Sequence, residues 1–460
     1  MGDDGMDDPD NINAYFDSLP DNVVAFPGTQ NSEVSEDLIA LQFTREMGSQ
    51  LRFDHDVGKW YQWQATRWGQ LTVPAAFHYA REIGRRLGQA KKSICKASVA
   101  GGAERFARAD PAHAVTASIW DKDPWLLGTP AGTIDLRNGR MHSPRKDEYI
   151  TKLTGCAPDS KPPARWIAFL TDATRGDMEM MTYLQRVAGY CLTGMTTEHA
   201  LFFIYGPGGN GKSVFLNTLV HILGDYALSA PMDTFTASKF NSHPTELAML
   251  KGARLVTASE TEEGRSWAEA RIKALTGGDP ITARYMRQDF FTYQPQFKLL
   301  FAGNHQPSLS AVDDAMKRRF NMMPFVHKPT EPDHMLEERL KEEAPRILGW
   351  ALRGCLDWQK HGLGRPASVV EATEDYFANQ DLFAQWLEDC CEIGPNLWDQ
   401  PGTLFRSWTE FARRNGEDAG TAKTFRKALE RKDFRWQRSN GFRKHVGLCV
   451  RSGSATSAAQ

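Results

Sequence analysis

Apolar residues along this chain follow two spacings, one typical of buried strands and one typical of amphipathic helices. Short continuous apolar runs predict core strands, and longer segments with apolar residues three or four apart predict helices between them. The predicted strands are Leu201–Tyr205, Arg254–Glu260, Phe297–Gly303 and Met322–Val326, and the main helical segments are Leu38–Met47, Ala75–Ala90, Trp166–Leu192 and Val214–Leu223. Strands that alternate with helices predict an α/β core.

The strand predicted at Leu201–Tyr205 ends abruptly in a glycine-rich segment that carries the pattern Gly-x-x-x-x-Gly-Lys-Ser. Glycines allow backbone N–H groups to point inward as an anion nest, and the following helix N-terminus adds partial positive charge. Lys212 would reach the β- and γ-phosphates of ATP, and the Ser213 hydroxyl would ligate Mg²⁺. An ordinary turn between strand and helix is the alternative. The predicted ATP-binding residues are Gly206, Gly208, Gly209, Asn210, Gly211, Lys212, Ser213 and Val214.

Two later strands end in polar residues that suit the same site. Glu260 lies 47 residues beyond Ser213 and is predicted to contact the metal and the attacking water, with Glu262 and Glu263 as alternative bases. Asn304 follows the strand Phe297–Gly303 and fits a sensor that orients this water, because ligands bind at the carboxyl ends of strands in open α/β sheets. A strand that merely ends in a charged loop is the alternative for Glu260.

Two basic groups in this half of the chain suit contacts with phosphates. Arg318 and Arg319 are candidates for an arginine finger supplied to the ATP of a neighbouring subunit, although a basic helix end would also explain them. The segment between Thr276 and Phe291 can form a hairpin with a basic, aromatic tip. Its residues Arg284, Tyr285 and Arg287 could grip a phosphodiester backbone and a base face.

Several of these segments, in this order, resemble motifs A, B, B′ and C and the arginine finger of superfamily 3 helicases, in particular the phage/plasmid primase–helicase family with its poxvirus relatives. The segments are Gly206–Ser213, Ser259–Gly264, Leu275–Arg284, Phe301–Asn304 and Arg318-Arg319, and upstream Thr129–Gly139 and Tyr183–Gly194 resemble the accompanying helicase-associated domain. The likeness spans roughly residues 36–360.

The resemblance implies an AAA+-like P-loop ATPase that forms a hexameric ring and moves 3′→5′ along single-stranded DNA with ATP and Mg²⁺. By the same resemblance Lys212, Glu260, Asn304 and Arg319 are catalytic, with Arg319 favoured over Arg318 because it directly precedes Phe320. Motif B shows Ser259-Glu260 rather than two adjacent acids, which leaves the catalytic base open. Only an acidic segment of about 35 residues precedes the helicase-associated part, so we expect no priming activity.

The domain organisation follows from the motifs and from shifts in composition. We expect an acidic disordered tail at 1–35, a mixed helicase-associated domain with a helical collar at 36–195, the ATPase core at 196–330, a helical lid and linker at 331–366, a basic winged-helix-like domain at 367–452 and a disordered tail at 453–460. The tryptophans of the predicted helicase-associated domain, residues 36–195, could stack on bases, but a role in the core is favoured.

Charge is unevenly spread along the chain, and its last 60 residues are basic. Residues 401–460 contain 13 Lys or Arg and 5 Asp or Glu, whereas residues 1–40 contain ten Asp or Glu and no Lys or Arg. Three helices at 381–392, 402–414 and 421–432 and a hairpin at 434–450 suggest a winged helix. Arg426, Lys427 and Arg431 would then face DNA phosphates, and docking of a protein is the alternative.

Bulk composition is that of a soluble globular protein, with 460 residues, 41% hydrophobic residues and a net charge of −2. No apolar stretch approaches the ~20 residues of a membrane span. Seven scattered cysteines without a Cys-x-x-Cys pair disfavour a zinc site and suit reduced thiols. We therefore expect a protein of the bacterial or phage-infected host cytoplasm.

The favoured function is an ATP-dependent DNA helicase in the replication of a phage, prophage or plasmid. Its expected partners are single-stranded and forked DNA, further copies of itself in a homo-hexamer, and a separate primase or replisome protein. The alternatives are a replication initiator whose ATP use mainly assembles the ring, and an AAA+ remodeller of protein partners.

Overall fold

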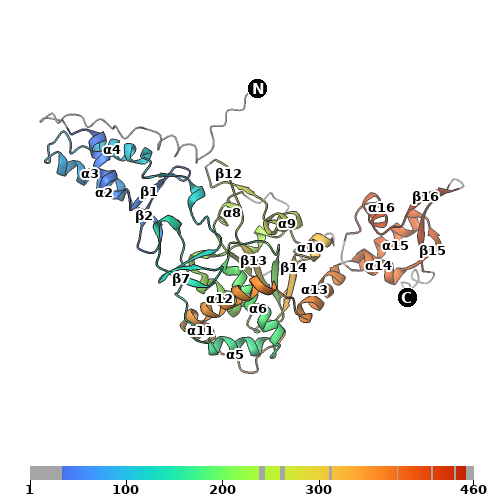
Figure 1. Ribbon diagram of the computed structural model, residues 1–460. Coiled ribbons are helices and arrows are strands. Elements are labelled where there is room, and N and C mark those ends of the chain that lie inside the picture. The colour runs from blue at the N-terminus through green and yellow to red at the C-terminus, as the bar shows by residue number, and fades with distance from the viewer. Residues whose placement is uncertain are drawn as a thin grey trace. The chain divides into compact units, whose positions relative to one another are not determined.

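A computed structural model describes residues 34–237, 244–259, 265–287, 289–309, 313–380, 382–415, 418–439 and 442–451 (Figure 1). Contacts divide the chain into two compact units. The first consists of residues up to Gln62 together with Gln70–Ala117, and the second of Trp63–Gly69 together with the chain from Ser118 onward. In the described part of the chain, no helix has the length and apolar character needed to cross a bilayer.

The first unit packs three helices against a small sheet. Its elements are α2 (Glu36–Met47), β1 (Leu51–Asp54), β2 (Lys59–Trp63), α3 (Ala75–Leu87), α4 (Ala97–Ala109) and β4 (Ala114–Val115), with β1 antiparallel to β2 and parallel to β4. Ser35 caps α2 because its hydroxyl accepts a hydrogen bond from the N–H of Leu38 at 3.1 Å. Trp60 is buried and donates to the Glu104 carboxylate at 2.8 Å, so this tryptophan fills the core as predicted.

The second unit includes Trp68 and Gly69 of β3 (Trp68–Gln70), and small strands and two helices then lead to its central sheet. β5 (Leu126–Thr129), β6 (Gly132–Asp135) and β7 (Arg140–His142) form an antiparallel sheet, and a turn at Asn138-Gly139 joins β6 to β7. The helical stretch predicted over Trp166–Leu192 is two helices, α5 (Ala164–Ala173) and α6 (Met178–Leu192). The break falls at Arg175 and Gly176, which both have positive φ.

The centre of the second unit is a five-stranded sheet in the order β14-β8-β13-β10-β9, parallel throughout. Its strands are β8 (Leu201–Tyr205), β9 (Ala227–Ser229), β10 (Leu255–Ser259), β13 (Lys298–Gly303) and β14 (Phe320–Pro324). Because all strands run the same way, their carboxyl ends meet at one edge. This mixed α/β architecture agrees with the coarse fold class expected from the sequence.

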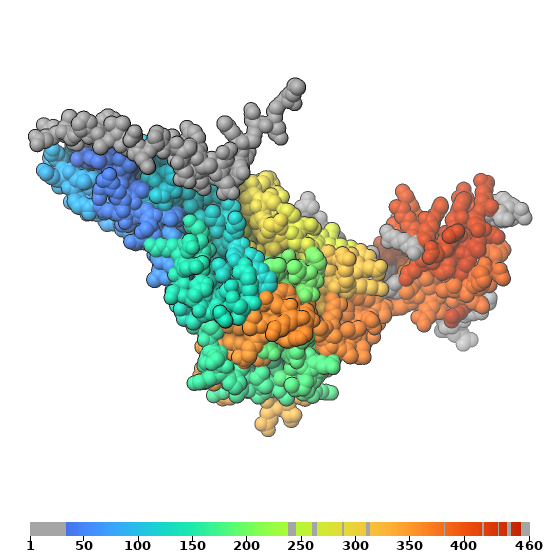
Figure 2. Space-filling model, viewed as in Figure 1, coloured from blue at the N-terminus to red at the C-terminus, as the bar shows by residue number. Residues whose placement is uncertain are grey.

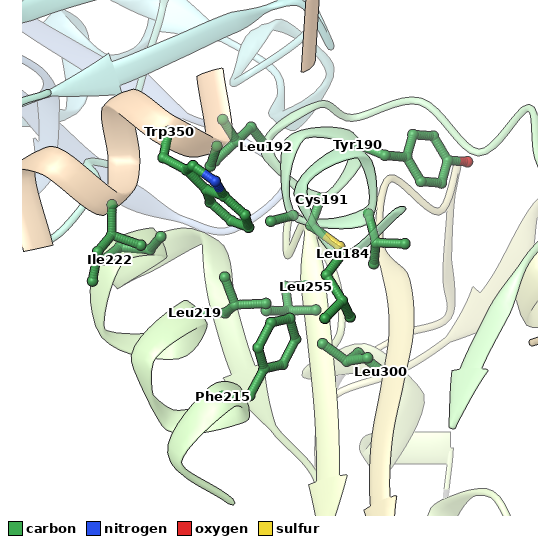
Figure 3. Packing of buried hydrophobic residues seen from close by; sticks show 14 of the residues in the cluster. Leu184, Tyr190, Cys191, Leu192, Phe215, Leu219, Ile222, Leu255, Leu300 and Trp350 are labelled. Carbon is green, nitrogen blue, oxygen red and sulfur yellow. The ribbon is translucent and has the colours of Figure 1, made fainter. Parts of the chain in front are cut away.

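Both faces of the sheet are buried, which explains the continuous apolar runs in its sequence. Phe202 and Ile204 of β8 point to one face, and Leu201 and Phe203 point to the other. On the first face, Phe215 of α7 (Lys212–Leu223), Leu255 and Leu300 pack with Trp350 of α12 (Ala344–His361) (Figure 3). Two glycines, Gly189 and Gly354, let α6 and α12 approach closely. A Cβ at Gly189, for example, would lie 2.0 Å from the backbone nitrogen of Cys355.

The remaining elements of this unit surround the sheet or extend from it. They are α8 (Pro244–Ala248), α9 (Glu269–Gly277), β11 (Ile281–Ala283), β12 (Phe291–Tyr293), α10 (Asp314–Lys317), α11 (Leu336–Glu342) and α13 (Ala367–Gln380). Tyr376 of α13 stacks on Phe320 of β14 at 5.9 Å, which places α13 on the second face of the sheet.

Two buried cations hold the C-terminus of α6 to the sheet. Arg254, directly before β10, donates to the carbonyls of Leu192 and Leu126, both at 2.6 Å. Lys298, the first residue of β13, donates to the carbonyls of Thr193 and Met195. Positive charge near a helix C-terminus is favourable, so both side chains stabilise this helix end, and neither has an ion-pair partner among the described residues.

The C-terminal elements follow the order helix, strand, helix, helix, strand, strand. They are α14 (Leu382–Cys390), β15 (Cys391–Asp399), α15 (Pro401–Arg414), α16 (Ala422–Arg431), β16 (Trp436–Ser439) and β17 (Phe442–Val450), with sheet order β15-β17-β16. The sequence prediction extended the first helix to residue 392 and was wrong there, because Cys391 begins β15. Gly394 and Pro395 within this strand gave it the appearance of a loop, and its register against β17 shifts at the same place.

Candidate functional site

The loop after β8 is shaped by glycines that no other residue could replace. Gly206, Gly209 and Gly211 have φ values of 147°, 78° and 86°. A Cβ at Gly206 would lie 2.0 Å from the carbonyl oxygen of Phe325, and one at Gly211 would lie 2.6 Å from the ring of Phe169. Left-handed conformations and close approach therefore both demand glycine here. The loop ends at α7, whose N-terminus has no side-chain cap.

Lys212 lies at the start of α7 and folds back over this loop. Its ammonium donates to the carbonyls of Gly206 at 2.7 Å and Pro207 at 3.0 Å, and to the side-chain oxygen of Asn210 at 2.9 Å. Burial lowers the pKa of Lys212 below its ordinary value. The amide of Asn210 in turn donates to the carbonyl of Phe325, just after β14, and this bond ties the loop to the neighbouring strand.

A cavity of about 820 Å³ opens over the loop at the carboxyl edge of the sheet. Its lining includes Gly208, Gly209, Asn210, Gly211, Lys212, Ser213 and Val214 from the loop and α7, Asp233 after β9, Ser259 and Arg265 on either side of the residues that follow β10, and Asn304 after β13. Seven of the eight predicted ATP-binding residues and Asn304 thus share one cavity. The eighth, Gly206, begins the loop. A cradle of backbone N–H groups with one buried lysine fits an anion such as a triphosphate.

Several predicted residues lie outside the residues that the structure describes. Glu260, Glu262 and Glu263 belong to the segment 260–264, directly after Ser259. Of the predicted metal contacts only Ser213 is therefore placed. Its hydroxyl is exposed to the cavity and suits a hard cation such as Mg²⁺.

Asp233 and Arg265 line the cavity and were missed by the sequence analysis. Their side chains form an ion pair at 3.4 Å across it. Asp233 follows β9, whose three residues are too short to give a recognisable apolar run. Since both side chains are substantially exposed, the pair itself contributes little to stability.

The two candidate finger residues occupy different environments. Arg319 is buried, and its guanidinium donates to the Thr276 hydroxyl at 3.0 Å and to the Ala315 carbonyl at 2.8 Å. Arg318 is exposed, and its side chain makes no hydrogen bond or ion pair within the described ranges. Of the two, Arg318 has a guanidinium that another subunit could meet.

The predicted hairpin is present, formed by β11 and β12 in antiparallel register. Arg284 lies over the ring of Phe290 at 4.9 Å, and Arg287 is exposed with a φ of 60°. Tyr285 stacks on Phe291 at 5.3 Å, and its hydroxyl donates to the Ala248 carbonyl at 3.2 Å. Met286 at 71% and Phe290 at 59% are the most exposed apolar side chains of the tip, and neither was singled out as a DNA contact from the sequence.

In the C-terminal part, α16 carries the predicted phosphate contacts. Lys427 is exposed, whereas Arg426 pairs with Glu430 at 2.8 Å and lies over the ring of Trp436 at 4.9 Å. Arg431 ends the helix, and its side chain lies outside the described part of the structure.

Two sequence families match the chain. One, described as D5 N terminal like, matches residues 40–175, and a family of unknown function (DUF5906) matches residues 204–319. The first match covers most of the first unit, and the second covers the glycine loop and the strands β9, β10 and β13 of the sheet.

Viral proteins with provisional names are similar to the chain. One from Acanthamoeba polyphaga mimivirus, provisionally named a helicase, is 27% identical over 296 residues, which are 58% of this chain and 31% of that protein. One from frog virus 3, also provisionally named a helicase, is 25% identical over 273 residues, 54% of this chain and 28% of that protein. An African swine fever virus protein, provisionally named a primase, is 23% identical over 241 residues, 50% of this chain and 25% of that protein. The chain thus spans less than a third of the length of these curated relatives.

Among solved structures, the C-terminal region of NrS-1 is similar to this chain. It covers 90% of this chain and 100% of its own length, with a TM-score of 0.52 and 12% sequence identity. The two chains therefore share a fold.

Proposed function

Because the chain is a relative of the D5-type primase–helicases, we propose that it is an ATP-dependent helicase that moves along single-stranded DNA during replication of a phage, prophage or plasmid. The observation that carries the proposal is the cavity of about 820 Å³ where the loop after β8, Lys212, Ser213 and Asn304 meet. It lies at the carboxyl edge of a parallel sheet, where ligands bind in this class of fold.

The loop residues would hold ATP by its phosphates. Backbone N–H groups between Gly206 and Ser213 donate to phosphate oxygens, and the N-terminus of α7 favours the negative charge. Lys212 exchanges its three oxygen partners for phosphate oxygens, which offer this partly buried ammonium a full opposite charge.

Hydrolysis needs a metal site and an oriented water beside the loop. Ser213 and a carboxylate after β10, from Glu260 or its neighbours Glu262 and Glu263, would hold Mg²⁺, which offsets phosphate charge in such sites. Asn304 lies at the tip of the adjacent strand and would orient the attacking water. The fold therefore supplies positioning and electrostatic stabilisation, which carry most of phosphoryl-transfer catalysis.

A neighbouring subunit of a homo-hexamer would complete the site with Arg318. This residue is exposed, whereas the guanidinium of Arg319 already donates hydrogen bonds to Thr276 and Ala315 of its own subunit. Hydrolysis would then be coupled to movement of the tip between β11 and β12, where Arg284 and Arg287 offer charge to a DNA strand and Met286 and Phe290 offer apolar surface.

ATP hydrolysis in the presence of single-stranded DNA tests this function. The purified chain should hydrolyse ATP faster when single-stranded DNA is added, and Lys212→Ala should abolish the activity. A hydrolysis rate that DNA does not change, but that a protein substrate raises, would instead favour a protein remodeller.

A second candidate function, origin recognition by an initiator, is favoured by the C-terminal element order. Helix, strand, helix, helix, strand, strand is the order of a winged helix, in which α16 would be the recognition helix. Arg426→Ala with Lys427→Ala should then weaken binding to the replicon's own origin more than binding to random DNA. Equal weakening of the binding to origin DNA and to random DNA would indicate that these side chains contact only the phosphate backbone of DNA.

A further inference from the structure

A strongly cationic surface of the first unit runs from the last turns of α3 through the following segment to the N-cap of α4. We call residues 81–96 the basic elbow. Its six cations are Arg81, Arg85, Arg86, Lys91, Lys92 and Lys96, against the single acid Glu82. The whole chain carries a net charge of −2, so this short segment departs sharply from the average.

The elbow has a defined backbone that fixes where its lysines project. The N–H of Ala90 donates to the Arg85 carbonyl at 2.9 Å, and the N–H of Cys95 donates to the Lys91 carbonyl at 3.1 Å. Ile94 anchors the segment beneath the end of α3, because a Cβ at Gly88 would lie only 2.9 Å from its side chain. The charged segment is therefore built into the fold of α3 and α4.

All six cations of the basic elbow are exposed. Arg86 pairs with Glu46, whereas the other five make no ion pair among the residues that the structure describes. Arg81 and Lys96, from opposite sides of the elbow, line one cavity of about 290 Å³. Cations of α3 and of the N-cap of α4 thus border the same cavity. Residues 81–96 belong to the blue part of the chain in Figure 2.

Stabilisation of helix ends explains only part of this charge. Arg85 and Arg86 lie in the last turn of α3, where cations are favourable. Lys96 is the N-cap residue of α4, where a cation is unfavourable, and the first turn of α4 contains no acid to offset it. Lys91 and Lys92 precede this helix and gain nothing from its dipole, so stabilisation of helix ends does not account for these three lysines.

We propose that the basic elbow binds the phosphate backbone of duplex DNA without reading its sequence. Clustered cations on a fixed surface match the charge density of a duplex. Proteins that bind single strands add several aromatic side chains on which bases stack, whereas residues 81–96 contain none and Phe77 is the one aromatic residue that lines the cavity of Arg81 and Lys96. This contact goes beyond the proposed function, because it concerns the duplex rather than the strand gripped by the β11–β12 hairpin.

Salt-dependent binding by the full chain tests the proposal, without ATP so that the result does not depend on hydrolysis. The variant is Lys91→Ala with Lys92→Ala and Lys96→Ala, and the probe is a labelled duplex of about 30 base pairs. Each lost phosphate contact lowers the slope of log Kd against log salt concentration by about 0.9, so the slope should fall by about 2.7. At about 0.15 M salt, the duplex affinity should fall on the order of 10²-fold.

A matched control removes three exposed cations of the same unit outside the elbow, by Arg45→Ala with Lys59→Ala and Arg105→Ala. This control should change the slope of log Kd against log salt concentration by less than the value of about 0.9 expected for one phosphate contact. Thermal unfolding of each variant checks folding, and Lys→Gln at the same three elbow positions replaces the alanine variant if that one is unstable. An elbow variant that binds duplex like the control overturns the proposal.

Two further arms identify the partner. A single strand of the same length should lose much less affinity than the duplex, and equal loss would overturn the assignment to duplex DNA. Polyglutamate at equal charge concentration should compete poorly with the duplex, and competition as strong as that of DNA would assign the surface to an acidic protein segment instead.

Discussion

Arg318 and Arg319 are neighbours in the chain with opposite environments. The guanidinium of Arg319 is buried and donates to the Thr276 hydroxyl at 3.0 Å, whereas Arg318 is exposed. Its backbone carbonyl accepts a hydrogen bond from Arg365 at 2.7 Å, so the chain at Arg318 is held while its side chain projects outward. One arginine thus belongs to the fold, and the other is available for contact with another subunit.

Arg318→Ala should lower DNA-stimulated ATP turnover by at least about 10²-fold while leaving thermal unfolding unchanged, because an arginine finger acts on the transition state alone. Arg319→Ala should lower the free energy of unfolding by about 2–4 kcal/mol, because a buried charged donor is lost and its acceptors are left unpaired. Turnover and thermal unfolding are measured on both variants.

Mixing inactive variants separates a finger from a residue acting within its own subunit. Oligomers mixed from Lys212→Ala and Arg318→Ala subunits contain some sites with both residues intact, so part of the ATP turnover should return. No recovery in mixtures whose assembly is verified by sizing would argue that Arg318 does not act across a subunit boundary.

Asn210 should act by positioning the loop after β8. Its amide joins that loop to the carbonyl of Phe325, and its oxygen accepts from Lys212 at 2.9 Å. Asn210→Ala should raise the KM for ATP about tenfold or more, with a smaller effect on kcat, because the loop is less organised before ATP binds. Asn210→Asp keeps the acceptor but loses the donor, and a normal KM for that variant would show that the bond to Phe325 is unimportant.

The tip of the β11–β12 hairpin should divide into DNA contacts and a structural residue. Arg287→Ala should weaken single-stranded DNA binding and lower the salt dependence of the affinity by the amount expected for about one phosphate contact. Tyr285→Phe removes only the hydroxyl that donates to Ala248 and should leave DNA affinity nearly unchanged. Phe290→Ala should weaken binding if this exposed ring stacks on a base, by about 1–3 kcal/mol. Fluorescence anisotropy at several salt concentrations measures all three variants.

Lys298 should make stability depend on pH. Burial lowers its pKa to about 7, well below that of a lysine in an unfolded chain. Between pH 7 and about 10 the unfolded chain therefore binds a proton that the folded chain lacks, and the free energy of unfolding rises with pH, by at most about 1.4 kcal/mol per unit. Below pH 7 both states carry the proton, so this contribution no longer changes.

Lys298→Met should remove this slope. Loss of the bonds to Thr193 and Met195 lowers stability at every pH, whereas loss of the titration makes the variant's curve flatter. Urea unfolding of both proteins from pH 7 to 9 measures the difference. Parallel curves would indicate that Lys298 stays charged when buried.

The strands at the centre of the fold were predictable because both faces of a parallel sheet are buried. Leu201–Tyr205 appears as a continuous apolar run and is β8 with those bounds. β9 was not predicted, because Ala227–Ser229 is short and carries one large apolar residue. β15 was hidden by Gly394 and Pro395, which interrupt it. The helix α4 was also missed, since its small residues give little apolar contrast.

In the candidate site, position along the chain indicates which residues the backbone brings to the loop, whereas tertiary contacts decide the environment of each side chain. The glycines around Lys212 follow from the turn itself, and Asn304 follows from the end of its strand. The sequence favoured Arg319 as the finger, whereas its burial against Thr276 depends on α9, which no local pattern shows. The basic elbow was not predicted from the sequence, because its cations come together on one surface only when Ile94 packs the segment against the end of α3.

The most direct test of the account is strand displacement on forked DNA, with ATP and Mg²⁺, by the natural chain and by Lys212→Ala. The natural chain should release the displaced strand only when ATP is present, and Lys212→Ala should bind the fork but release no strand. Displacement by Lys212→Ala at the natural rate, or displacement without ATP, would contradict the assignment of the cavity over Lys212 as the motor site.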